Sequence, residues 1–195
     1  MSYLNEQIDW KNVFMNVLRH VVPKMFVRPM FTVIKDMQDS GEMKKDLVIV
    51  EVGTDLALNA KNIQRFVLFK KLYLIDPYFD DYGSYPSGDK RFNIAKERMG
   101  NDERVVFLRE TSEEASKRFD NNSVDCIYID GVHKYDYCLQ DINLWYDKVR
   151  KKGIIGGHDF FGSGLGVILA VTDYVNLHKI RDRLDGFSTD WWIKK

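Results

Sequence analysis

The stretch LVIVEVGTDLALNAKNIQRFVLFKKLYLID, residues 47–76, decides the fold of this chain. It begins with a short apolar run, LVIVEV, and it ends with a second one, LYLID. Between them, residues 59–69 carry apolar side chains at helical spacing. Short continuous apolar runs are typical of parallel strands that are buried on both faces. The stretch therefore predicts a strand, a helix and a second strand parallel to the first.

The same alternation continues toward the C-terminus. Three more apolar runs follow, RVVFLR, VDCIYID and GIIGGHD, and STDWWIKK at residues 188–195 is apolar and aromatic enough to be a final strand. Helical spacing recurs at residues 91–99, from Cys138 to Val149, and at residues 166–178. Strands that alternate with helices in this way predict an α/β fold, a doubly wound and mostly parallel sheet with helices on both faces.

The first forty residues differ in texture from the rest of the chain. Their apolar side chains, from Trp10 to Met37, have helical spacing that is interrupted by Pro23 and Pro29. We therefore expect an N-terminal helical segment at residues 1–45, followed by the α/β core at residues 46–195. A length of 195 residues suits one domain with a full core, so we expect a single domain.

Composition narrows the classes of function and location. Lys plus Arg and Asp plus Glu both number 29, so the chain has no overall field that would gather nucleic acid, and we expect no nucleic-acid partner. The chain contains no unbroken apolar span, which argues against a membrane protein. The start, MSYLNEQIDW, is acidic where a secretion signal is basic, so we expect a soluble, cytoplasmic protein with reduced, structural cysteines at Cys126 and Cys138.

Unusual polar residues follow the predicted strands. In an open parallel sheet, ligands bind in the crevice beyond the carboxyl ends of the strands, so these residues are the candidates for function. After the five strands in turn they are Glu51, Gly53 and Thr54; Asp76 and Tyr78; Thr111 and Ser112; Asp130 and His133; and His158 and Asp159.

Two of these positions suggest a ligand by themselves. A glycine at position 53 lets the backbone pass close to a ligand, and the acidic Glu51 beside it suits a cationic one, although an ordinary strand-to-helix turn explains both residues equally. The further glycines that pyrophosphate binding needs are absent, which argues against NAD. A carboxylate at Asp76 can accept hydrogen bonds from the two hydroxyls of a ribose, or it can stabilise a turn before Pro77.

The most specific pattern is IDGVHKYDYCLQDINLWYDKVRKKGIIGGHDF, residues 129–160. Together with VEVGT, LIDPY and ETSEEASKRF, it resembles a subgroup of the class I S-adenosylmethionine-dependent methyltransferases, and the resemblance extends from about Leu47 to the C-terminal aromatic strand. It implies a Rossmann-like sheet of seven strands, S-adenosylmethionine as the cofactor and a small-molecule substrate. A homo-oligomer stays open.

The resemblance also implies roles for single residues. It places Glu51, Gly53 and Thr54 at the methionine portion of the cofactor, Asp76 at its ribose, Thr111 and Ser112 at the adenine edge, and Asp130 near the methyl donor. Tyr78, in a loop at residues 76–90 that is a candidate lid with Tyr82 and Tyr85, is a further candidate to contact the cofactor. This chain departs from the family at Ala57 and Asn59, where a second glycine is usual, so the alternative is a catalytically silent cofactor-binding or interaction protein.

The last two polar clusters raise the question of a metal and of a base. Asp130, His158 and Asp159 would offer two carboxylates and an imidazole to Mg²⁺ or another divalent cation, as in catechol-type methyltransferases, or they would merely hydrogen-bond the end of the sheet. His133 is the first candidate for a general base, with Asp130 and His158 as its catalytic neighbours, and its alternative role is to fasten its own loop. Because nitrogen-directed relatives often carry an Asn/Asp-Pro-Pro-Tyr turn where this chain has IDGVH, we expect O-methylation of a small hydroxylated molecule such as a sugar.

Overall fold

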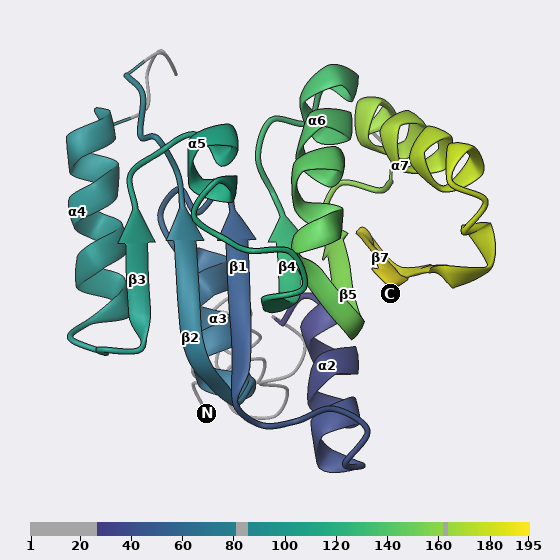
Figure 1. Cartoon of the computed structure of the whole chain (residues 1–195). Coiled ribbons are helices and arrows are strands. Elements are labelled where there is room, and N and C mark those ends of the chain that lie inside the picture. Colours follow the sequence, from purple (N-terminus) through teal and green to yellow (C-terminus); the bar gives the residue numbers. More distant parts are fainter. Residues whose placement is uncertain (1–26, 81–85, 162–163) are drawn as a thin grey trace, which may run out of the picture.

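The computed structural model describes residues 27–80, 86–161 and 164–195 (Figure 1). The helix expected from Trp10 to Val21 and the loop residues Tyr82 and Tyr85 lie outside these ranges.

The core is a seven-stranded mixed sheet in the order β3-β2-β1-β4-β5-β7-β6. The strands β1 to β5 are parallel to one another, and β7 runs antiparallel to both β5 and β6. The predicted doubly wound, mostly parallel sheet is therefore confirmed. The strands are β1 (Leu47–Val52), β2 (Phe69–Ile75), β3 (Val105–Leu108), β4 (Val124–Ile129), β5 (Val149–Gly157), β6 (Leu184–Phe187) and β7 (Asp190–Lys194).

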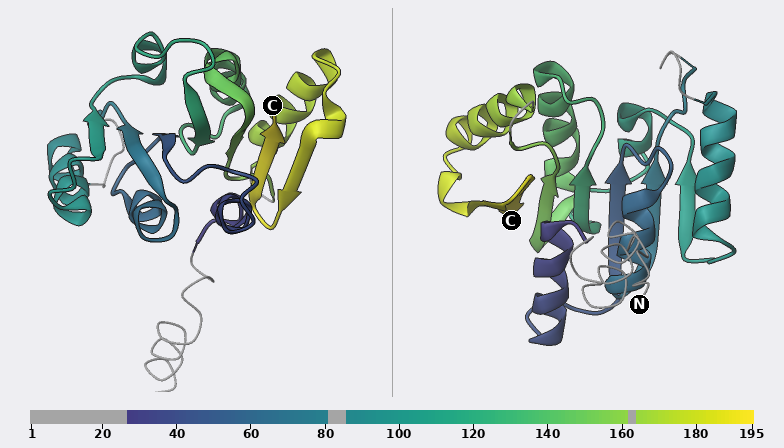
Figure 2. Two further views of the ribbon diagram at one scale, coloured as in Figure 1. Left: turned by 60° about the horizontal axis from the view of Figure 1, so that its bottom comes forward. Right: turned by 180° about the vertical axis from the view of Figure 1, so that it is seen from behind.

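Helices cover both faces of this sheet, as Figure 2 shows from two further directions. One face carries α2 (Pro29–Asp39), α3 (Leu58–Phe66) and α4 (Gly88–Met99). The other carries α5 (Ser112–Ser116), α6 (Tyr135–Trp145) and α7 (Leu165–Leu177), and the short 3₁₀ turns η2 (Tyr146–Lys148) and η3 (Arg181–Arg183) precede β5 and β6. None of the described helices is both long enough and apolar enough to span a bilayer.

Alternation along the strands produces two apolar cores. Ile49 of β1 packs into the core beneath α2, α3 and α4, whereas its neighbour Val50 packs into the core beneath α5, α6 and α7. Successive side chains of a strand point to opposite faces, and both faces are covered, so the central strands need apolar residues at every position. This is the physical reason for the unbroken apolar runs in the sequence.

Tertiary contacts shift some of the predicted boundaries. The helix expected at residues 59–69 ends at Phe66, and Phe69 already begins β2. Buried Gln38 of α2 bonds both backbone groups of Leu68, accepting from its N–H at 3.1 Å and donating to its carbonyl at 2.7 Å. The side chain of a distant helix thus takes the hydrogen bonds that a longer α3 would have made.

Candidate functional site

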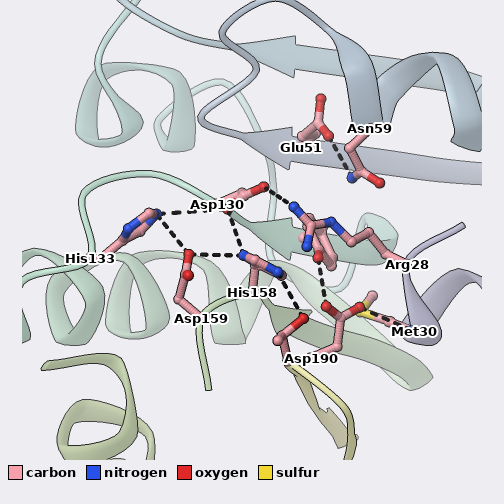
Figure 3. Close-up of polar contacts among 11 residues, drawn as sticks. Arg28, Met30, Glu51, Asn59, Asp130, His133, His158, Asp159 and Asp190 are labelled. Atoms are coloured by element: carbon pink, nitrogen blue, oxygen red, sulfur yellow. Dashed lines mark hydrogen bonds and ion pairs between the residues drawn. The ribbon is translucent and has the colours of Figure 1, made fainter. Parts of the chain in front are cut away.

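The predicted residues that follow β1, β2, β4 and β5 lie on the side of the sheet where the parallel strands have their carboxyl ends. The chain also enters β7 at this edge, because β7 runs antiparallel to β5 and Trp191 pairs with Gly157. Figure 3 shows the resulting cluster of polar side chains around Asp130.

Two carboxylates and two imidazoles meet at the ends of β4 and β5 (Figure 3). His133 Nε2 lies 3.0 Å from Asp159 Oδ2 and 3.8 Å from Asp130 Oδ1. His158 Nδ1 lies 2.9 Å and 3.8 Å from the same two oxygens. The structure therefore brings together all four residues that the sequence placed here, with both histidines flanking the same carboxylate pair.

The chemistry of these donors fits a divalent cation. One ligand atom from each of Asp130, His133 and Asp159 lies within 4.8 Å of the others, and the distances of His158 to the two carboxylates are nearly the same as those of His133. Carboxylate oxygens with an imidazole nitrogen suit Mg²⁺ or Mn²⁺. The predicted set named His158 as the imidazole ligand, and the geometry offers His133 as a second candidate.

The two histidines differ in how they are held. His158 is largely buried, and its Nε2 lies 2.8 Å from Thr189 Oγ1, which fixes the ring from the opposite side. The side chain of His133 is 53% exposed. The neighbouring carboxylates, Asp130 first and Asp159 with it, raise the pKa of His133 above its ordinary value. One imidazole is thus oriented within the protein, and the other meets solvent.

Glu51, which was expected to face a cationic ligand, is a buried carboxyl group at the end of β1. Its Oε1 accepts a hydrogen bond of 2.8 Å from Asn59 Nδ2, and its Oε2 has no partner among the described residues. Burial raises the pKa of Glu51 to about 8. A buried carboxyl oxygen without a partner fits a ligand that carries an ammonium group, as the methionine portion of S-adenosylmethionine does. Asn59, a departure from the family pattern, is here the residue that holds Glu51.

The loop after β1 has a left-handed backbone at Ala57, although alanine stands there where the family usually has a second glycine. Gly53 has φ +86°, and a Cβ there would lie 2.2 Å from the carbonyl oxygen of Asp130, so the nearby end of β4 by itself requires this glycine. Ala57 adopts φ 56° and ψ 34°, which is the left-handed region, and its methyl group is buried in the core beneath α2, α3 and α4. Thr54 between them is also buried.

Asp76 holds two loops together. Its Oδ2 accepts from the backbone N–H of Asp55 at 2.9 Å, and its Oδ1 accepts from that of Tyr78 at 2.8 Å. Burial raises its pKa above the ordinary value. The turn interpretation of Asp76 is therefore realised, and a ribose contact through the remaining lone pairs stays a prediction.

Tyr78 is held within its own loop, beside the carboxyl groups at the ends of β1 and β2. Its side chain is buried, its hydroxyl donates to the carbonyl of Asp55 at 2.9 Å, and its ring packs against Phe92 with the centroids 5.1 Å apart. The aromatic side chain thus packs its own loop, and a cofactor contact by this ring stays a prediction.

The hydroxyls of Thr111 and Ser112 are engaged at the start of α5. Thr111 caps the helix in a reciprocal capping box with Glu114, and Ser112 Oγ accepts a hydrogen bond of 2.8 Å from Trp145 Nε1. Contact of these residues with adenine remains a prediction that their side-chain hydrogen bonds do not support.

Two further residues of the site were missed in the sequence. Arg28 Nη2, just before α2, lies 3.7 Å from Asp130 Oδ2. Asp190 at the start of β7 accepts from the backbone N–H of Met30 at 3.2 Å and from the hydroxyl of Tyr128 at 3.0 Å (Figure 3). Both lie far in sequence from the strand ends of the first five strands. The one available signal was that Asp190 lies in the predicted final strand, residues 188–195.

Comparison with known proteins shows which family this chain is similar to. A family model described as "Methyltransferase domain" matches residues 50–160, which is more than half of the chain. A curated relative, uncharacterized protein R132 of Acanthamoeba polyphaga mimivirus, is 26% identical over 160 residues. That match covers 73% of this chain and 65% of the relative.

Solved structures agree with the fold. An O-methyltransferase from Bacillus cereus in complex with SAH has a TM-score of 0.58 at 15% identity, with 95% of this chain and 90% of that chain covered. A TDP-rhamnose 3'-O-methyltransferase of calicheamicin biosynthesis has a TM-score of 0.58 at 13% identity, covering 97% and 88%. The MycE methyltransferase of the mycinamycin pathway, in complex with Mg, SAH and mycinamycin VI, has a TM-score of 0.53 at 14% identity, covering 84% and 47%. The chain therefore belongs to the methyltransferase-domain family, and its fold is that of these methyltransferase structures.

Proposed function

We propose that this chain methylates an oxygen atom of a small hydroxylated molecule, such as a sugar, with the help of a divalent cation. The observation that carries the proposal is the cluster of Asp130, His133, His158 and Asp159 at the ends of β4 and β5. Similarity in fold to O-methyltransferases, one of them with Mg in its complex, supports it. The unpartnered Oε2 of Glu51 supports a cofactor whose ammonium group lies at the end of β1.

In this proposal Asp130, Asp159 and His158 hold the cation. A histidine that binds a metal is usually oriented by a hydrogen bond to its other ring nitrogen, and Thr189 supplies that bond to His158. When bound, the cation would favour the ionised form of an acceptor hydroxyl. Asp159 is itself fixed, because its backbone has φ 59° and Gly164 packs tightly against it.

His133 is then the residue that removes the proton of the acceptor hydroxyl. Its exposed imidazole can meet a substrate from solvent, and it lies next to the carboxylates that would hold the substrate oxygens. Methyl transfer also needs in-line approach of the oxygen to the methyl group, and the rigid ends of β4 and β5 provide the positioning.

The experiment separates cofactor binding, metal binding and transfer. Calorimetry with S-adenosylhomocysteine tests the cofactor site, and Mg²⁺ titration tests the cation site. Methyl transfer to a panel of sugars and catechols, each with Mg²⁺ or chelator, tests the reaction. His158→Ala should lose Mg²⁺ binding, whereas His133→Ala should retain it and lose about 100-fold or more in kcat. Asp182→Asn, an exposed acid outside the site, is the control.

Two outcomes would contradict the proposal. Equal Mg²⁺ affinity in His158→Ala and the wild type would remove His158 from the metal site. Tight binding of S-adenosylhomocysteine without transfer to any acceptor would favour the catalytically silent alternative. The conformation of Ala57 argues against a closed site, because its methyl group points into the core beneath α2, α3 and α4.

A further inference from the structure

A groove of about 740 Å³ lies beside the proposed catalytic cluster, between α2, α3 and the turn that joins β6 to β7. This volume is in the range of small-molecule sites. Its described lining includes Arg28, Leu58, Asn59, Phe187, Thr189 and Trp192.

Three of these lining residues touch the proposed site directly. Arg28 Nη2 lies 3.7 Å from Asp130 Oδ2, Thr189 Oγ1 lies 2.8 Å from His158 Nε2, and Asn59 Nδ2 lies 2.8 Å from Glu51 Oε1. Single lining residues therefore connect the groove with the carboxylate of Asp130, with the imidazole of His158 and with Glu51, where we propose that the cofactor binds. A molecule that fills it can present a hydroxyl to that cluster.

The polar lining favours an anionic ligand. Arg28 is the charged side chain among the described lining residues, and these residues include no carboxylate. The guanidinium side chain is 32% exposed, so it still has surface to offer to a ligand after its contact with Asp130.

The apolar lining favours a ring beside that charge. Phe187 is 72% exposed and Leu58 is 63% exposed, although both are large apolar side chains that border the groove. Large apolar side chains left exposed beside a pocket are typical of a ligand site.

We infer that this groove binds the methyl acceptor, and that the acceptor is a hydroxylated ring compound with an anionic group that pairs with Arg28. The inference rests on the proposed function and adds the chemical class of the substrate. The anion is a carboxylate or a phosphate, since a guanidinium binds both through paired N–H donors.

Two pairs of probes test whether the groove prefers an anionic ligand and distinguish a carboxylate from a phosphate. The carboxylate pair is 3,4-dihydroxybenzoate and its neutral amide, 3,4-dihydroxybenzamide. The phosphate pair is glucose 1-phosphate and glucose. Affinities are measured by calorimetry on the full chain saturated with S-adenosylhomocysteine and Mg²⁺. In at least one pair, the anion should bind about tenfold more tightly than its neutral partner.

Variants then assign the preference to the groove. Arg28→Gln should remove the preference for the anion, and Arg28→Lys should retain part of it. Lys35→Gln on the adjoining helix α2 changes the net charge equally, but Lys35 pairs with Asp39 outside the groove, so this variant should leave the preference intact. Phe187→Ala should weaken both members of the preferred pair about equally, without an effect on S-adenosylhomocysteine binding.

The outcomes distinguish this inference from the proposed function. If S-adenosylhomocysteine binds but neither anion binds more tightly than its neutral partner, or if Arg28→Gln keeps the preference, the groove inference is wrong and the methyltransferase proposal stands. If S-adenosylhomocysteine does not bind at all, the proposed function fails and the inference fails with it.

Discussion

Glu51 is a carboxyl group whose proton links stability to pH. Burial raises its pKa to about 8 from an ordinary value of 4.5. Between these two values the folded protein holds a proton that the unfolded chain releases. The free energy of unfolding therefore falls as pH rises from 5 to 8, with a slope of at most about 1.4 kcal/mol per pH unit from this group.

We predict that Glu51→Gln makes this dependence flatter. Urea unfolding of the variant and the wild type at pH 5, 6, 7 and 8 should show the variant gaining stability relative to the wild type at each step. Glu110→Gln is the control, because Arg118 lowers the pKa of Glu110, so its contribution is constant in this range. Parallel curves for Glu51→Gln and the wild type would show that Glu51 is already ionised in the folded protein.

At the scale of elements, α2 is joined to the site by one buried carboxylate. Asp190 accepts from the backbone N–H of Met30 in the first turn of α2, and no side chain caps this helix at Arg28. The same carboxylate accepts from the hydroxyl of Tyr128 on β4. Asp190 thus ties an N-terminal helix, a central strand and the final strand together, and the adjacent Thr189 orients His158.

Asp190→Ala should release the first turn of α2. The loss of two hydrogen bonds to a buried carboxylate should lower the free energy of unfolding by about 2–4 kcal/mol and speed amide exchange at Met30 and Phe31. Tyr128→Phe removes one of the bonds and should cost less, with slow exchange retained at Met30. Asp36→Asn, at an exposed position of the same helix, should change neither quantity. Unchanged exchange in Asp190→Ala would mean that packing alone holds α2 in place.

How far the sequence could predict these elements depends on where their stabilising contacts lie. The five parallel strands could be predicted because each is a short apolar run, and burial on both faces explains these runs in the central strands β1 and β4. β6 was missed because its residues, LDGF, form a mostly exposed edge strand that pairs only with β7. The carboxylate pair at the ends of β4 and β5 could be predicted from strand order, since neighbouring parallel strands end together. The different settings of His133 and His158 could not be predicted, because His158 is held by Thr189, which follows it by 31 residues.

At the scale of the whole molecule, the sheet separates two apolar cores. Gly156 of β5 lies where helix α2 and strand β7 both contact this strand. A Cβ on this residue would lie 2.2 Å from the carbonyl oxygen of Trp191 on β7 and 2.7 Å from the sulfur of Met30 on α2. Residues from the beginning, middle and end of the described chain thus share one contact point. The absence of a side chain at Gly156 lets α2 and β7 approach β5 closely.

Gly156→Ala should therefore destabilise the whole protein by about 3 kcal/mol, at the upper end of the cost of an overpacked core, because the nearest atom belongs to a backbone that cannot rotate away. Gly131→Ala is the matched control, since its Cβ would have no neighbour closer than 3.5 Å and should cost much less. Urea unfolding, followed by tryptophan fluorescence and by circular dichroism, should give a lower midpoint for Gly156→Ala that is the same with both probes. Different midpoints for the two probes would show that α2 and β7 unfold separately from the rest of the sheet, and that the tight contact at Gly156 does not couple them.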